Sequence, residues 1–170
     1  MLFRSPSHFK DADNHPVENV SWDDVQVFLK KLNTLTHKQF CLPTEAQWEY
    51  AAQGGSKSHK HKYAGSDTID EVAWYSENSN NQTHRVAEKQ ANELGLYDMS
   101  GNVSEWCSDS YAAYSSKQVK NPKKSALQDA KVIRGGSFSS YASDCAVTYR
   151  SSFSSTYRSN NIGFRLVLNM

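Results

Sequence analysis

The chain has 170 residues and a formal net charge of +1, and its length suits one domain with a hydrophobic core. Near-neutrality excludes a general attraction to nucleic acid or acidic membranes, and the lack of a long apolar segment excludes a membrane span or a signal peptide. We therefore expect a soluble chain with no nucleic-acid partner and no membrane insertion, and surface display or export would require a longer precursor.

Two helices are predicted in the first third of the chain. Ser21 is a good N-cap, aspartates follow it in the first turn, and apolar residues then recur at helical spacing, which predicts a helix over 21–34. Thr44 and Gln47 have the spacing of a capping box, and a glycine pair ends the segment, which predicts a second helix over 44–53.

The run 57–62 alternates lysines with two histidines, His59 and His61. Its simplest interpretation is a solvated loop, with metal or anion binding as the alternative. The three cysteines of the chain have no CxxC spacing, which argues against a disulfide framework and against a cysteine-rich zinc site.

The pattern then changes to short apolar clusters separated by Gly, Ser, Asn and Asp, each of strand length. Two helices followed by many short strands predict an α+β fold with an antiparallel sheet and many loops. The polar segment 109–130 is expected to be an exposed loop. The predicted strands cover residues 72–75, 95–97, 103–106, 132–134, 146–150 and 163–168.

Five motifs follow one another along the chain: PVENVSWDD at 16–24, LPTEAQWEYAA at 42–52, GLYDMSGNVSEW at 95–106, RGGSF at 134–138 and NIGFR at 161–165. Together they resemble the formylglycine-generating-enzyme family, the sulfatase-modifying factors. The resemblance implies a C-type-lectin-like fold with limited regular structure. We therefore expect residues 1–170 to form one domain of this type, shortened at its N-terminus relative to the family.

The resemblance also implies a structural calcium ion at the third motif. Hard cations prefer oxygen ligands, often carboxylates together with backbone carbonyls of a tight loop. Asp98 and Glu105 would supply carboxylate oxygens, and Gly101 and Val103 would supply backbone oxygens. The alternative is an Asx-type turn in which Asn102 bonds to its own backbone.

In the family's enzymes, two cysteines after the Arg-Gly-Gly-Ser motif are implied to bind copper(I) and to oxidise a substrate cysteine with oxygen. Here the first of these positions falls on Ser140 and the second on Cys145. A hydroxyl is a hard ligand and cannot replace a soft thiolate, so we expect no copper site. We predict no catalytic residue, with Cys145 as the alternative, although free cysteine is most often buried and structural.

The segment 137–161 is rich in Ser, Tyr and Asn and contains no Lys, Glu, Gln, Met or Trp. Paratopes use this mixture of rigid aromatic and adaptable polar side chains. The segment also resembles the variable region of proteins diversified by retroelements, whose adenine-directed mutagenesis yields these residue types. The alternative is an ordinary polar loop. The candidate ligand-binding residues are Ser139, Ser140, Tyr141, Ser143, Asp144, Tyr149, Ser152, Phe153, Ser154, Tyr157, Asn160 and Asn161.

Three functions are compatible with these features. The leading hypothesis is a non-catalytic binding module that displays residues 139–161 to a protein or glycan ligand. The second is a copper-dependent oxidase of the formylglycine type, or a relative with altered chemistry. The third is an accessory structural domain whose partner supplies the activity.

Overall fold

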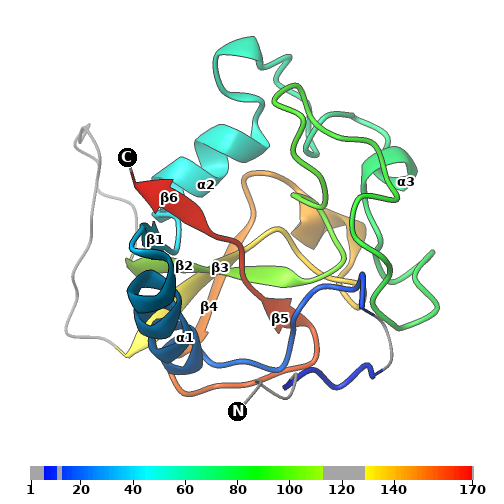
Figure 1. The fold of residues 1–170 in the computed structure, drawn as a ribbon. Coiled ribbons are helices and arrows are strands. Elements are labelled where there is room, and N and C mark those ends of the chain that lie inside the picture. The colour runs from blue at the N-terminus through cyan, green and yellow to red at the C-terminus, as the bar shows by residue number, and fades with distance from the viewer. Residues whose placement is uncertain (1–5, 11–12, 113–128, 170) are drawn as a thin grey trace.

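The computed structural model describes residues 6–10, 13–112 and 129–169 (Figure 1). Its helices are α1 (Trp22–Thr36), α2 (Glu45–Ala52) and α3 (Ile69–Val72), with 3-10 turns at Gly55–Lys57 and Ala142–Cys145. Its strands are β1 (Gln39–Cys41), β2 (Ser104–Ser110), β3 (Ala130–Arg134), β4 (Arg150–Ser154), β5 (Ile162–Gly163) and β6 (Val167–Asn169). No helix in these three ranges is long and apolar enough to cross a bilayer.

The first two helices begin where their capping residues predict. Ser21 Oγ accepts the backbone N–H of Asp24 at 3.0 Å, and the Asp24 carboxylate accepts the N–H of Ser21 at 2.9 Å. Thr44 and Gln47 form the same reciprocal pair at the start of α2. These bonds satisfy backbone donors that have no partner inside the helix, so both predicted helices are confirmed.

The strands form a four-stranded sheet in the order β4-β3-β2-β5 and a two-stranded sheet of β1 and β6. The irregular chain between α2 and β2 lies on the side of the molecule away from α1 (Figure 1). Loops therefore make up much of the molecule, as the family resemblance implies.

The larger sheet is covered on both faces. On one, the α1 face, Trp106 and Ile133 join the core cluster of α1. On the other, the α2 face, Cys107 and Val132 pack with Trp48 of α2. Successive residues of a strand point to opposite faces, so neighbours in sequence divide between these two clusters.

The larger sheet is mixed, and the prediction of an antiparallel sheet is corrected on this point. β2 pairs antiparallel with β3 but parallel with β5. An added Cβ on Gly163 would lie 2.3 Å from the carbonyl oxygen of Val17, and Gly163 also forms a β-bridge with Glu18. The last motif therefore joins the sheet through a close backbone contact with the first motif, which only glycine permits.

Of the predicted strands, 103–106 and 132–134 are confirmed as the starting part of β2 and the end of β3. The strand predicted at 95–97 is wrong, because these residues follow a turn at 93–94 and pair with no strand. The strand predicted at 72–75 is also wrong, because it begins at the end of α3 and continues without a ladder.

Two further strand predictions have wrong bounds. The segment 146–150 mostly precedes β4, and 163–168 is split between β5 and β6. The predicted loop 109–130 begins inside β2 and ends inside β3, while residues 113–128 lie outside the described part of the chain. Irregular segments fill the core here: Val72, Ala73, Tyr75 and Ala146 pack together as a third buried cluster.

Candidate functional site

A hollow of about 160 Å³ opens on the α1 face of the sheet, beside the edge strand β4. We call it the serine–tyrosine hollow. It takes side chains from the segment after β3, from β4 and from the segment before β5. Its lining residues are Ser104, Ile133, Gly136, Ser140, Asp144, Tyr149, Ser151, Phe153, Asn161 and Ile162.

Strand alternation explains which residues of β4 reach the hollow. In the antiparallel ladder of β3 and β4, Ile133 lies opposite Ser151 and Lys131 lies opposite Phe153. Residues that face each other across a ladder point to the same side of the sheet. Ile133, Ser151 and Phe153 therefore line the hollow together, as the cavity lining shows.

Hydroxyl groups at the start of the segment hold one wall of the hollow. Ser140 Oγ accepts the backbone N–H of Ser137 and lies 3.0 Å from the Ser137 hydroxyl. The side-chain amide of Asn161 donates to Ser139 Oγ at 3.1 Å, which joins the two ends of the segment. Short polar side chains therefore hold this part of the lining in place.

Four aromatic side chains of the segment 137–161 face solvent, and two of them, Tyr149 and Phe153, line the hollow. Tyr141 is 75% exposed, Tyr149 39%, Phe153 37% and Tyr157 42%. The rings of Phe153 and Tyr157 stack with centroids 4.5 Å apart and an interplanar angle of 13°. Burial and the nearby Asp144 carboxylate raise the pKa of Tyr149, so its hydroxyl stays a neutral donor and acceptor at neutral pH.

None of the twelve predicted ligand residues is buried. Ser140, Asp144, Tyr149, Phe153 and Asn161 line the hollow. Three more contact this group through side chains: Ser139 bonds to Asn161, Ser143 bonds to Asp144, and Tyr157 stacks on Phe153.

Four predicted residues lie elsewhere. Ser152 and Ser154 alternate with Phe153, so they point to the α2 side of the sheet. Tyr141 and Asn160 are accessible but do not line the hollow. The sequence prediction missed Ser151, and the alternation of β4 is the signal that identifies it.

Cys145 lies behind the hollow and does not line it. Its side chain is fully buried, and an added Cβ on Gly136 would lie 2.7 Å from its sulfur. Burial raises the pKa of the Cys145 thiol to about 12, so the thiol is protonated at neutral pH. Nucleophilic chemistry and copper(I) binding both need a thiolate, and this environment disfavours it.

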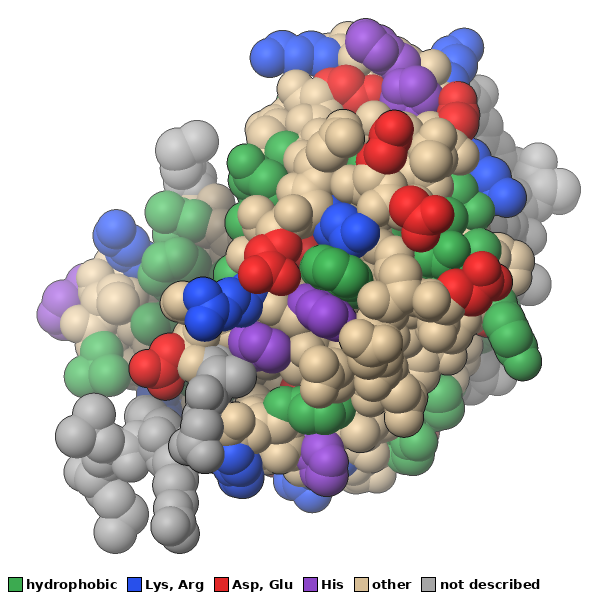
Figure 2. All heavy atoms as spheres, turned by 90° about the vertical axis from the view of Figure 1, so that its right-hand side faces the viewer, with side chains coloured by type: hydrophobic (Ala, Val, Ile, Leu, Met, Phe, Trp, Pro, Cys, Tyr) green, Lys and Arg blue, Asp and Glu red, His purple; other side chains and the backbone are tan. Residues whose placement is uncertain are grey.

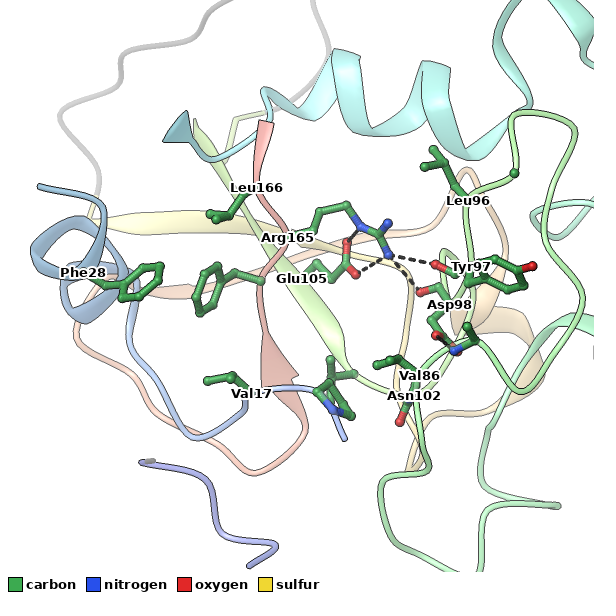
Figure 3. Close-up of a pocket in the computed structure, with 15 residues that line it drawn as sticks. Val17, Phe28, Val86, Leu96, Tyr97, Asp98, Asn102, Glu105, Arg165 and Leu166 are labelled. Atoms are coloured by element: carbon green, nitrogen blue, oxygen red, sulfur yellow. Dashed lines mark hydrogen bonds and ion pairs between the residues drawn. The ribbon is translucent and has the colours of Figure 1, made fainter. Parts of the chain in front are cut away.

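The predicted calcium motif lies at a second, wider hollow of about 590 Å³ lined by segments 95–98 and 164–166 among others (Figure 3). The buried Glu105 carboxylate accepts three hydrogen bonds there: from Trp48 Nε1 at 2.6 Å, from Arg165 Nε at 2.6 Å and from Arg165 Nη2 at 2.7 Å. Arg165 is thus a structural ion-pair partner of Glu105.

Asp98 supplies the one observation that fits a cation at this motif. Its Oδ2 accepts the backbone N–H of Ala87 at 2.8 Å, whereas its Oδ1 is buried without a hydrogen-bond partner. Burial raises the pKa of the Asp98 carboxyl, although the hydrogen bond from Ala87 and the charge of Arg165 act in the opposite direction. Glu105, in contrast, is already neutralised by Arg165, so the two predicted carboxylate ligands differ in their need for an ion.

A group of ion pairs on the α2 face anchors the ribbon of β3 and β4. The buried Arg134 binds Glu45 at 3.3 Å and Glu49 at 2.5 Å, and it donates to the carbonyl of Val147 at 2.7 Å. Arg150, directly opposite Arg134 in the ladder, shares Glu45 through Nε at 2.7 Å. Both arginines are therefore tied to α2, directly behind the strands that line the serine–tyrosine hollow.

The mixed sheet, capped helices and loop-rich periphery define an α+β domain of the formylglycine-generating-enzyme type, and the motif order agrees with it. Residues 3–170 match the model of the sulfatase-modifying factor enzyme 1-like domain. The chain belongs to this family.

Two characterised relatives show the range of the family. Chaperone protein LppX of Paenibacillus barcinonensis is 36% identical over 96% of this chain and 72% of its own length. The formylglycine-generating enzyme of Streptomyces coelicolor is 32% identical over 89% of this chain, which spans only 52% of that enzyme.

Among solved structures, Treponema denticola variable protein 1 superposes with a TM-score of 0.88 at 31% identity, covering 96% of this chain and 77% of that one. The expected likeness to a variable protein of this fold is therefore found in three dimensions as well as in sequence.

Proposed function

We propose that this domain is a non-catalytic binding module that holds a protein or glycan ligand at the serine–tyrosine hollow. The observation that supports it best is that five of the twelve predicted residues, Ser140, Asp144, Tyr149, Phe153 and Asn161, line one hollow. Four exposed aromatic rings belong to the same segment. Exposed aromatic side chains surrounded by short polar ones are typical of adaptable protein-binding surfaces.

The chemical environment favours binding over oxidation. Ser140 is a hydroxyl at the position where the family resemblance implies a thiol in the enzymes, and Cys145 is buried with a raised pKa. Relatives named as a chaperone and as a variable protein support binding to another molecule, whereas the relative named as an enzyme supports the oxidase alternative. A protein partner that supplies an activity is the accessory-domain alternative.

The test is a two-part screen of the purified domain on a glycan array and against a displayed peptide library. We expect at least one ligand class whose binding is lost in the Tyr149→Ala and Phe153→Ala variants but kept in Tyr50→Ala. Tyr50 is 58% exposed on α2 and provides a matched aromatic control. Binding that survives both hollow variants would show that the ligand uses another surface.

The oxidase alternative has its own assay. The domain is incubated with copper(I), oxygen and a cysteine-containing peptide, and aldehyde formation is measured by mass spectrometry. We expect no aldehyde and no stoichiometric copper(I) binding, because the site offers one buried thiol where two thiolates are required. Catalytic aldehyde formation would overturn the binding-module proposal.

A further inference from the structure

A cluster of three metal-ligating side chains lies outside both hollows. His59 and His61 come from the segment after α2, and Glu93 comes from the loop that precedes the calcium motif. One potential ligand atom of each side chain lies within 4.8 Å of the other two. Figure 2 shows two histidine side chains side by side at the top of this face, among lysines and carboxylates.

The backbone brings the two imidazoles together. Lys60, which separates them, adopts the left-handed region with φ 62°, and the ring centroids of His59 and His61 are 5.7 Å apart. In an extended run the two side chains would also lie on one side of the chain, but no turn would fix the distance between their rings. The turn therefore places both rings beside the carboxylate of Glu93.

Glu93 is fixed by the residue before it. The buried Asn92 donates its amide to the carbonyl of Ala51 at the end of α2 at 2.7 Å and accepts the backbone N–H groups of Leu94 and Leu96. These bonds connect the loop to the helix end, so Glu93 is held in position by backbone geometry.

The two carboxylate oxygens of Glu93 differ in their contacts. Oε1 accepts the backbone N–H of His59 at 3.1 Å, while Oε2 is buried without a hydrogen-bond partner. A buried carboxylate oxygen without a hydrogen-bond partner leaves room for one more donor or a cation at that oxygen.

His61 has the second partner that metal-bound histidines commonly use. Its Nδ1 lies 3.1 Å from the carboxylate of Asp67, which also accepts the backbone N–H of Lys62 at 2.8 Å. A carboxylate that accepts a hydrogen bond from Nδ1–H keeps the proton on Nδ1, leaves the lone pair of Nε2 free for a metal ion, and fixes the ring.

We propose that His59, His61 and Glu93 bind a divalent transition metal ion, with Zn²⁺ as the best fit and Asp67 as the group that orients His61. Two imidazoles and one carboxylate are a zinc ligand set, with water in the fourth position. Ligands at about 2.0–2.2 Å in a tetrahedron lie roughly 3.4 Å from one another, so modest side-chain rotations close the present spacing. The ion would connect the segment after α2 to the loop 91–96.

The neighbouring lysines offer the opposite interpretation, an anion site. Lys62 is directed over the ring of Tyr63, with Nζ 5.1 Å from the centroid. An anion bound between the two histidines would also lie beside the Glu93 carboxylate, and the two negative charges would repel each other. The cation is therefore the better occupant.

The experiment is a Zn²⁺ titration by calorimetry of metal-stripped protein, in buffer with excess Ca²⁺ so that the predicted calcium motif stays constant. We expect binding at one ion per chain and a rise in melting temperature, because a ligand of the native state stabilises it. Co²⁺ should show the visible absorption of a low-coordinate site. Acidification should weaken binding, because protons compete for the imidazole nitrogens.

Matched variants locate the site. His59→Asn, His61→Asn and Glu93→Gln should each abolish stoichiometric binding, and Asp67→Asn should weaken it by about 10–100-fold. His37→Asn is the control, because His37 is exposed and has a left-handed backbone that asparagine accepts. Circular dichroism confirms that each variant is folded.

Three results would overturn the proposal. They are no stoichiometric Zn²⁺ binding to the wild-type chain, unchanged Zn²⁺ binding in folded His59→Asn and Glu93→Gln variants, and stabilisation by inorganic phosphate where Zn²⁺ has no effect.

Discussion

The two faces of the β3–β4 ribbon differ in what they contact. On the α2 face, Arg134 and Arg150 are held by carboxylates of α2. On the α1 face, Ser151 and Phe153 line an open hollow. A strand that alternates between a fixed side and an accessible side lets one set of residues hold the backbone while the other set contacts ligand. The difference teaches that anchoring and binding in this domain are assigned to alternate positions of the same strands.

The largest loss of stability is expected from removing an ion-pair residue on the α2 face. Arg134→Ala truncates a fully buried side chain and removes the partner of Glu49 and of the Val147 carbonyl, while Glu45 keeps Arg150, so it should cost about 2–5 kcal/mol of unfolding free energy. Urea denaturation measures the loss. Ser151→Ala, on the open face of the neighbouring strand, should cost less than about 0.5 kcal/mol. Equal losses in the two variants would refute the division between faces.

Removing calcium is a second test of the α2 face, because the predicted ligand Glu105 of β2 lies opposite Arg134 of β3. If the predicted structural ion binds, excess chelator should lower the melting temperature, and the free energy removed is about 2.7 kcal/mol at a calcium concentration of 100 Kd. Differential scanning calorimetry with calcium and with chelator measures it.

Asp98→Asn is the matching control for calcium. It should remove the calcium response, and it should cost little in chelator because burial already disfavours the charged Asp98. Superimposable melting curves of the wild-type chain in calcium and in chelator would rule the ion out.

Substitutions on the α1 face that lines the hollow should lower ligand affinity more than they lower the stability of the fold. Phe153→Ala should weaken a ligand found in the screen by about 2 kcal/mol, roughly 30-fold in Kd. Because Phe153 is 37% exposed, its removal should cost less than about 1 kcal/mol of unfolding free energy. Isothermal titration and urea denaturation separate the two quantities, and the reverse result would make Phe153 a core residue.

The smallest effect concerns an ion pair between α1 and the end of the binding segment. Arg158 donates to Asp24 at 2.6 Å and holds the pKa of that carboxyl well below its usual value. A lowered pKa stabilises the fold above the unfolded value of 3.8, and the stabilisation is lost as pH falls through the acid range.

Asp24→Asn should therefore destabilise the domain by less than about 1 kcal/mol at pH 7, because the pair is partly exposed, and by less still at acid pH. Urea denaturation at the two pH values measures the difference. If the difference in unfolding free energy between the variant and the wild type grew at acid pH, the stabilising role of the Asp24–Arg158 ion pair would be contradicted.

Local signals in the sequence predicted the helices and the family, because capping boxes and motif order depend on few neighbouring residues. They did not predict β1 or the parallel placement of β5, since both require partners far away in the chain. In the site, composition identified Tyr149 and Phe153 but could not separate Ser151 from Ser152, because the facing direction depends on where β4 begins. Metal binding at His59 and His61 was only the alternative interpretation of the run 57–62, and Glu93 was missed because it comes from another loop.

The pairing of β1 with β6 has a consequence for synthesis. Gln39 lies opposite Asn169, and Ser104 lies opposite Ile162, so each sheet needs residues from the last tenth of the chain. Contacts this distant in sequence form slowly, because closing a long loop costs conformational entropy before the contacts that stabilise it can form. A nascent chain should therefore stay incompletely folded until residues 162–169 have left the ribosome, and its core strands are accessible to other molecules during this interval.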